Sequence, residues 1–239
     1  MTDRRNDHGQ PIGPDVPGWT GCASIPRTAM QGHYCDVVPL ETSHSADLHT
    51  AYSADTTGAL WTYMPTGPFN SMSEVEAWVK TCSQSTDPLF FAIIDKRNGK
   101  AIGVASFLRM DPANGVAEVG YIAFSPALQK TPMATEAMYL MMGRVLGELG
   151  YRRYEWKCDA LNAASQAAAK RLGFSYEGTF RQAIVYKGRN RDTAWFSIID
   201  KDWPRIRTAF ENWLAPDNFD DNGLQCQRLN ALMPDDLQA

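Results

Sequence analysis

The chain has 239 residues, of which 44% are hydrophobic and 11% aromatic, and its formal net charge is −4. This length and apolar content suit one large domain, or one domain with extensions, built around a real core. The negative charge argues against nucleic acid as the main partner, because such binding requires a basic surface.

The cysteines lie at positions 22, 35, 82, 158 and 226 and form no CxxC pair. An odd count without close spacing disfavours a disulfide framework and a structural zinc site, so we expect reduced thiols and no metal. The polar N-terminus resembles no signal peptide, and no apolar run approaches the ~18 residues that span a bilayer. We therefore expect a cytoplasmic protein with no membrane partner.

Both ends of the chain lack an apolar period. Residues 1–32 are rich in proline and glycine and are expected to form an irregular arm, and residues 215–239 are expected to form a tail with one short helical stretch. The domain is placed at residues 33–214. The arm and the tail could cover this domain or join a homodimer.

The first half of the domain begins with a short strand at Tyr34–Pro39 and a helix near Ala46–Ser53. Prolines and a glycine predict a loop over Trp61–Phe69. Ser73 is the expected N-cap of a helix that ends near Cys82. Strands are then expected over the ranges 89–95, 101–108 and 116–124, the first two joined by an Asn-Gly turn.

The second half is predicted to start with a helix from Pro132 to Leu149, because apolar residues recur there at steps of three and four. A strand at Tyr154–Cys158 and an alanine-rich helix at Asn162–Leu172 follow. Two strands, at about 175–186 and 193–199, and a helix at Pro204–Leu214 complete the domain. This order predicts an α+β fold with a mixed, mostly antiparallel sheet and helices on both faces.

The segment GYIAF-SPALQKTP-MATEA is the most informative one. It reads as a strand, a loop and a helix that starts with Thr131 as N-cap and Pro132 as first residue. A helix N-terminus at a sheet edge offers N–H groups and partial positive charge, which suits a pyrophosphate. Many helices begin in this way without a ligand, so the physical pattern alone leaves the anion site open.

Three segments together resemble the GCN5-related N-acetyltransferases (GNAT), and specifically their RimJ/RimL-like branch. The first is Glu118–Phe124 followed by Gln129 and Ala134-Thr135-Glu136-Ala137. The second is Asn162-Ala-Ala-Ser165 with Lys170-Arg-Leu-Gly-Phe174, and the third is Tyr176-Glu-Gly178 with Arg181. The match covers roughly residues 33–205 and implies the GNAT fold.

The resemblance implies that acetyl-CoA lies between the two parallel central strands, with its pantetheine beside the first of them and its pyrophosphate on the loop 129–135. The residues to which it assigns coenzyme binding are Ile122, Phe124, Gln129, Lys130, Thr131, Met133, Ala134, Thr135, Asn162 and Ser165. Two positions depart from the family pattern. Pro132 replaces a residue with an N–H and so removes one phosphate donor, and Ile184 stands where some RimL-like relatives carry a glutamate base.

Acetyl transfer needs a free amine, a polarised thioester carbonyl and a proton for the departing thiolate. Ser165 is the candidate proton donor; the alternative is a serine that helps to cap its helix. Glu118 is an acid in an otherwise apolar central strand and is the candidate base; the alternative is a salt-bridged structural carboxylate.

Trp61, Tyr63 and Phe69 are candidates for the wall of the acceptor pocket, and the alternative is an aromatic loop that closes one end of the core. Arg181 and Asp192 could shape the acceptor site from the last two strands, although a cross-strand ion pair between them is the favoured explanation. A cleft open at both ends would favour a peptide, whereas one closed by the loop 61–69 would favour a small amine.

The sequence thus predicts an N-acetyltransferase in which an amine attacks the thioester of acetyl-CoA directly. The branch suggests a protein N-terminal amine as acceptor, with a metabolite or antibiotic amine as the alternative. The rival from another class is a non-catalytic acyl-CoA-binding protein, which Pro132 and Ile184 would explain.

Overall fold

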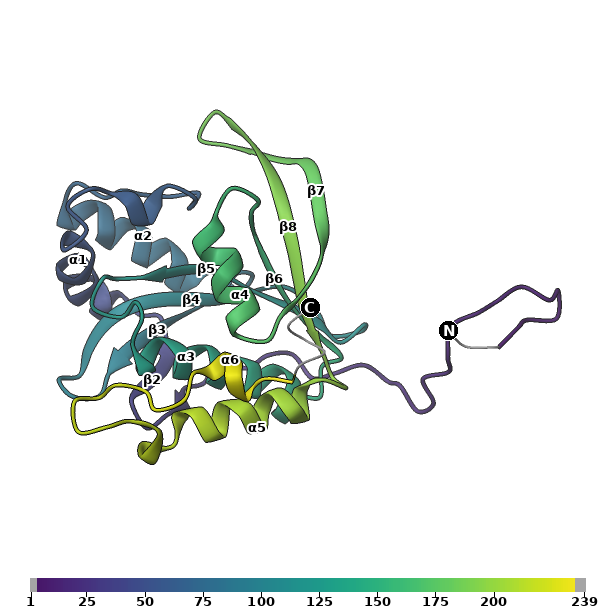
Figure 1. Ribbon diagram of the computed structural model, residues 1–239. Helices are drawn as coiled ribbons and strands as arrows, with labels where there is room; N and C mark the ends of the chain where they lie inside the picture. The colour runs from purple at the N-terminus through teal and green to yellow at the C-terminus, as the bar shows by residue number, and fades with distance from the viewer. Residues whose placement is uncertain (1–3, 235–239) are drawn as a thin grey trace.

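The computed structural model describes residues 4–234, and an eight-stranded sheet runs through its centre (Figure 1). The strand order is β1-β2-β3-β4-β5-β6-β8-β7. The strands are β1 (Met30–Gln31), β2 (Cys35–Pro39), β3 (Leu89–Asp95), β4 (Lys100–Asp111), β5 (Val116–Phe124), β6 (Arg153–Asp159), β7 (Ser175–Tyr186) and β8 (Arg189–Ile199). The helices are α1 (Ser45–Ser53), α2 (Met72–Gln84), α3 (Pro132–Met142), α4 (Ala163–Arg171), α5 (Trp203–Leu214) and α6 (Leu229–Leu232).

Helices cover both faces of the sheet, as predicted. Successive residues of a strand point to opposite faces, so a strand that is apolar throughout needs a cover on each side. Phe90 and Ala92 of β3 face α1 and α2, in one core cluster with Leu48 and Val79. Phe91 and Ile93 face the opposite cluster, which α3, α5 and parts of β6 and β8 complete. The predicted α+β class and the GNAT fold are therefore confirmed.

The sheet splits between β5 and β6, which are its parallel pair. The two strands pair only from Val116 opposite Arg153 to Val119 opposite Trp156. On the other side of β5, Ser106 pairs with Gly120 and Val104 with Ala123, so a bulge lies between them at Tyr121, whose φ is 49°. The split and the bulge leave backbone groups of β5 facing an opening, and such bulges often border active sites.

The predicted helix starts are confirmed at α3 and corrected at α2. Thr131 accepts a hydrogen bond from the N–H of Ala134 at 3.3 Å, and Pro132 takes the first helical position. At α2 the N-cap is Ser71, not Ser73, and its hydroxyl accepts from the N–H of Glu74 at 3.3 Å. The Glu74 carboxylate in turn accepts from the N–H of Asn70, which fixes the helix start two residues earlier than predicted.

The helix predicted over 132–149 is continuous, but its last part, Gly143–Glu148, is a π-helix. The buried carboxylate of Glu136 in α3 accepts hydrogen bonds from the N–H groups of His33, Tyr34 and Cys35 at 2.6, 2.7 and 2.8 Å. These bonds fasten the β1–β2 turn to α3, and they hold the start of the domain against the helix that begins beside the split.

The β7–β8 hairpin is longer than the sequence predicted and projects beyond the body of the sheet (Figure 1). β8 begins at Arg189, not Thr193, because Tyr186 pairs with Arg189 across a two-residue turn at Lys187-Gly188. The polar residues Asn190 and Arg191 concealed this part of the strand, since both sides of a projecting hairpin face solvent.

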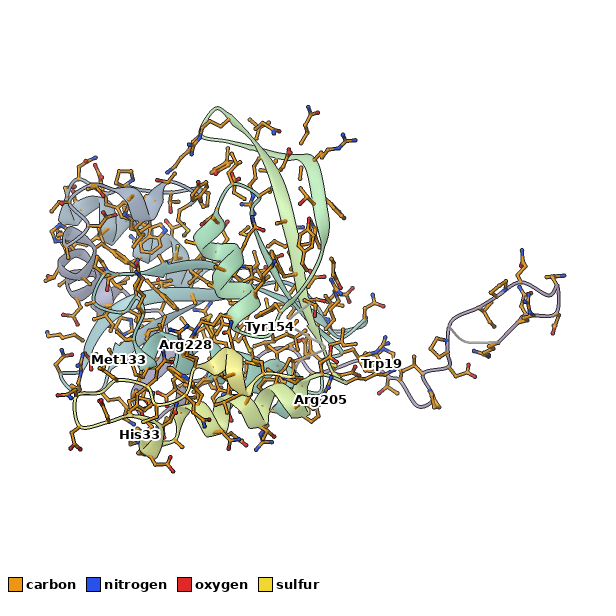
Figure 2. The ribbon with its side chains drawn as sticks, in the orientation of Figure 1. Trp19, His33, Met133, Tyr154, Arg205 and Arg228 are labelled. Carbon is orange, nitrogen blue, oxygen red and sulfur yellow. The ribbon has the colours of Figure 1, made fainter. Side chains whose placement is uncertain are left out.

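The two ends of the described chain differ in how they meet the domain. The N-terminal arm leaves the body in Figure 1, although Trp19, labelled in Figure 2, donates a hydrogen bond to the carbonyl of Ala113 at 2.8 Å. The C-terminal tail folds back, and Leu229 and Met233 are buried in the main core. No helix among residues 4–234 has the length and apolar character needed to cross a membrane.

Candidate active site

A cleft of about 1460 Å³ opens where β5 and β6 part. Small-molecule pockets usually measure ~300–1,000 Å³, so this one has room for a coenzyme and an acceptor together. β5, β6 and the hairpin β7–β8 line one part of it, and the start of α3, one face of α4 and the tail line the other part.

The start of α3 gives the cleft an anion-binding end. Thr131 donates its hydroxyl proton to the carbonyl of Leu128 at 2.6 Å and caps the helix with the same oxygen. Lys130 adopts a left-handed conformation with φ of 60°, which costs a non-glycine residue free energy and is frequent where backbone must face a ligand. Gln129 braces the turn by donating from Nε2 to the carbonyl of Phe124 at 2.8 Å.

A buried charge cluster lies where the two strands part. Glu118 stands beside Glu155 in register. Lys157 Nζ lies 2.9 Å from Glu118 Oε2, 2.7 Å from Glu155 Oε2 and 3.8 Å from the centre of the Trp195 ring. Arg109 Nε lies 3.3 Å from the same oxygen of Glu118. One ammonium group thus holds two carboxylates together inside the protein.

The two carboxylates of this cluster differ in acidity. Burial raises the pKa of Glu118, and the opposing effects of Lys157 and Arg109 do not cancel that rise. Burial also acts to raise the pKa of Glu155, but hydrogen bonds from Lys157 and Arg153 outweigh it, and the pKa of Glu155 falls. The contact between Glu118 Oε2 and Lys157 is an ion pair without hydrogen-bond geometry, so this oxygen has no hydrogen bond among the described residues.

The start of α4 brings a hydroxyl to the other wall of the split. Asn162 caps α4 by accepting from the N–H of Ser165 at 3.0 Å. Ser165 Oγ accepts a hydrogen bond from Trp156 Nε1 at 3.0 Å. Since that bond occupies an oxygen lone pair, the hydroxyl proton of Ser165 remains to be donated to another group.

The family profile described as the acetyltransferase (GNAT) domain matches residues 37–175. A GCN5-related N-acetyltransferase from Brucella melitensis is 44% identical, with 91% of this chain and 99% of that chain covered and a TM-score of 0.89. The chain belongs to the GNAT acetyltransferase family.

Two further relatives are also acetyltransferases. A probable GNAT-family acetyltransferase from Chromobacterium violaceum is 39% identical over 82% of this chain and 98% of its own, with a TM-score of 0.75. The ribosomal-protein-serine acetyltransferase of Escherichia coli is 32% identical over 36% of this chain and 48% of its own length. The protein is thus an acetyl-CoA-dependent N-acetyltransferase, and the partial match to the E. coli enzyme agrees with the resemblance to the RimJ/RimL-like branch.

Most of the residues that were predicted to meet acetyl-CoA line this GNAT cleft. They are Ile122, Phe124, Gln129, Lys130, Thr131, Ala134, Thr135, Asn162 and Ser165, and the candidate base Glu118 lines it as well. Met133 differs, because its side chain is buried in the main core (Figure 2). From that position Met133 can offer the ligand only its backbone.

Of the residues predicted for the acceptor pocket, one lines the cleft, two lie in the core and one is exposed outside the cleft. Tyr63 lines the cleft, and its hydroxyl donates to the carbonyl of Leu161 at 3.1 Å. Trp61 and Phe69 pack against each other and against Trp78 in the α1–α2 core. They therefore anchor the loop to the core and do not line the cleft. Arg181 is exposed on β7 outside the cleft, and it makes no ion pair with Asp192 among the described residues.

Asp192 has other partners, which corrects the expected cross-strand ion pair. Its carboxylate accepts from the N–H of Gln182 and from the side chain of Asn190, at 2.8 and 2.9 Å. These bonds lower the pKa of Asp192, and Arg181 contributes only a weaker charge effect. Asp192 therefore fixes the hairpin backbone.

Several cleft residues escaped the sequence analysis. Arg109, Lys157 and Arg171 line the cleft, and the buried Glu155 pairs with Lys157. Glu155 and Lys157 are two residues apart in a predicted strand, so they had to share one face, and this signal could have revealed them. Arg171 could be recognised only from its three-dimensional surroundings.

The hairpin bridges the end of the cleft that lies beside the α1–α2 loop. Lys187 Nζ, at the hairpin turn, donates to the carbonyls of Trp61, Thr66 and Gly67 at 2.9, 3.2 and 2.8 Å. Together with the Tyr63–Leu161 bond, these contacts join the α1–α2 loop to the far side of the split. Among residues 4–234 there is no group of three or more His, Cys, Asp or Glu side chains that could hold a metal ion.

Proposed function

We propose that this acetyltransferase acts on the N-terminal α-amine of a protein or peptide, with Glu118 as base and Ser165 as proton donor. The unequal acidity of Glu118 and Glu155 carries the assignment of the base. Two neighbouring carboxylates whose surroundings push their pKa values apart are typical of acid–base sites. Glu118 is the one with the raised pKa, and it lines the cleft with its Oε2 held by Lys157 and Arg109.

The coenzyme end is proposed at the start of α3, and the residues there suit acetyl-CoA. The free N–H groups of the first helical turn, the turn at Lys130 and the Thr131 cap provide donors for a pyrophosphate, and Pro132 contributes none. The unpaired edge of β5 at Ile122 and Phe124 can pair with the amides of the pantetheine arm. When bound, the coenzyme supplies the thioester that the amine attacks.

Within this arrangement the residues have separate tasks. Glu118 takes the proton of the attacking amine, directly or through one water molecule. Ser165, oriented by the bond from Trp156, gives its hydroxyl proton to the departing thiolate and takes a replacement proton from water, while Glu118 releases the amine's proton to solvent. Lys157 holds both glutamates in place and is a positioning residue.

The protein N-terminal acceptor is supported by the relatives named above and by the size of the cleft. The E. coli relative is named for acting on a ribosomal-protein serine. A small amine is the second candidate, favoured by the bridge that Lys187 and Tyr63 make over the acceptor end. Both ligand classes would use the same base and proton donor.

A direct assay separates these acceptors. The enzyme is incubated with acetyl-CoA and either peptides with a free N-terminal serine, the same peptides with a blocked N-terminus, or a panel of small amines. Thiol release and mass spectrometry then report transfer. Transfer to the free peptide alone supports the proposal, and transfer to small amines alone replaces it with the second candidate. No thiol release with any amine would reject the proposed acceptor and residue roles.

A further inference from the structure

A row of residues on α4 runs along the cleft from its reactive end to its anion-binding end. Asn162, Ser165, Ala168 and Arg171 recur at three-residue steps, and all of them line the cleft. Nine residues of helix span about 14 Å. Each three-residue step turns by about 60° around the helix, so this row winds around α4 and carries the capping Asn162 and the hydroxyl of Ser165 at one end of the cleft-lining residues and a guanidinium group at the other.

One hydrogen bond and one cation–π contact hold Arg171 beside the first turns of α3. Its Nη1 donates to Thr135 Oγ1 at 3.1 Å, and its Cζ lies 5.1 Å from the centre of the Trp213 ring. Thr135 is one turn beyond the cap Thr131. The guanidinium group is thus placed next to the helix N-terminus at which the pyrophosphate is proposed to bind.

The charge of Arg171 has no counterion in the described protein. No carboxylate of residues 4–234 forms an ion pair with it, and burial lowers its pKa without any opposing effect from an acid. Partly buried charges are normally paired, because desolvation costs free energy that a partner offsets. A fixed, uncompensated guanidinium group on a cleft wall indicates that the missing partner is an anion bound in that cleft.

The neighbouring sequence explains why such a cation is useful here. Pro132 at the first helical position cannot donate a hydrogen bond, so the helix N-terminus presents one donor fewer than a chain with another residue there. Arginine binds phosphate through two parallel N–H groups and keeps its charge at any physiological pH. Trp213 restricts the guanidinium plane, which reduces the entropy lost when a phosphate is bound.

We propose that Arg171 is a phosphate-binding residue that contacts the pyrophosphate of acetyl-CoA from α4 and replaces the donor that Pro132 lacks. This inference rests on the coenzyme site proposed above. Helix α5 takes part through Trp213, and the C-terminal tail takes part through the cleft-lining segment 223–228, which ends at Arg228 (Figure 2).

Binding can be measured without turnover by isothermal titration with CoA and with 3′-dephospho-CoA. The variant is Arg171→Met, which keeps an unbranched stem against Trp213. Arg152→Met is the matched control, because Arg152 also lies over a tryptophan, at 5.4 Å from the Trp19 ring, but outside the cleft. We expect Arg171→Met to weaken both ligands by about tenfold to a hundredfold, as for a lost charged hydrogen bond. Arg152→Met should bind both as the wild type does.

The two ligands and a second variant keep the outcomes distinct. Arg171→Lys, which retains the charge without the planar fork, should recover part of the affinity for both ligands. A loss confined to CoA would overturn the inference by assigning Arg171 to the ribose 3′-phosphate. Unchanged affinity of a folded Arg171→Met protein for both ligands would overturn it while leaving the coenzyme site intact. A wild-type protein that binds neither ligand would instead reject the proposed coenzyme site itself.

Discussion

Replacing Lys157 with methionine tests the assignment of Glu118 as the base. Lys157 Nζ lies 2.9 Å from a Glu118 oxygen, and both side chains are almost fully buried. The methionine variant removes this cation and leaves Glu155, which Arg153 still pairs, as a negative neighbour, so the pKa of Glu118 should rise above its already raised value. The acidic limb of the pH–rate profile, which reports the unprotonated base, should therefore move to higher pH.

The size of that shift follows from the same contact. Two unit charges 2.9 Å apart interact by about 6 kcal/mol at an effective dielectric constant of about 20. That figure is an upper limit, because Arg109 remains 3.3 Å from Glu118 and water can relax around the site. Loss of one neighbouring charge usually moves a carboxyl pKa by ~1–3 units, so we expect the limb to move by about 2 units.

The assay is kcat/KM against pH with one acceptor throughout, so that the titration of the acceptor amine is common to all variants. Lys100→Met is the control, because Lys100 is an exposed lysine in a salt bridge with Asp47 and should leave the profile unchanged. Circular dichroism establishes that each variant is folded, since an unpaired buried charge can cost ~3–5 kcal/mol. If the acidic limb of a folded, active Lys157→Met enzyme stays in place, Glu118 is not the base.

Three further predictions concern the scaffold around the site. Glu136→Gln should lower the free energy of unfolding by about 3 kcal/mol in urea titrations, because an amide cannot accept three backbone N–H bonds as a carboxylate does; Glu211→Gln, at an exposed i,i+4 pair with Arg207, should change it by less than about 0.5 kcal/mol. Lys187→Met should raise KM for the acceptor several-fold and leave CoA affinity by titration unchanged, and an unchanged KM would remove the bridge from the acceptor site. Asp95→Asn should destabilise the protein by about 1 kcal/mol at pH 7. The hydrogen bonds from Arg97 lower the pKa of Asp95, so this difference should disappear as pH falls below ~4 and should not reappear at lower pH.

The features predicted correctly from the sequence are those with a local cause. Thr131 and Pro132 specify a helix start through their own backbone and side-chain chemistry, whatever packs around them. The same is true of the apolar strands that became β3 and β5. Ser73 was wrong for a related reason: Asn70, Ser71 and Ser73 all stand within four positions at the start of the helix, and only the hydrogen bonds that Glu74 makes with Asn70 and Ser71 select among them.

The features that were missed depend on contacts between distant parts of the chain. Lys157 becomes a partner of Glu118 only because β5 and β6 pair in parallel with a particular register. Arg171 meets Thr135 and Trp213, which lie 36 and 42 positions away along the chain. Trp61 and Phe69 were assigned to the pocket wall because the resemblance places the acceptor beside the loops of the first helices, but both pack against Trp78 of α2 in the core.

The position of the buried charges explains why the sheet splits where it does. A buried ion cluster is a weak source of stability, since apolar residues of similar volume often serve as well or better. Here the cluster occupies the level at which the β5–β6 pairing ends, with Glu118 beside Glu155 and one pair remaining above them. Charges at that level keep the opening polar and prevent the two strands from closing over their unpaired edges. The same groups that cost the fold stability therefore hold the cleft open and place a raised-pKa carboxylate at its end, which is the position a base needs when an amine approaches through the split.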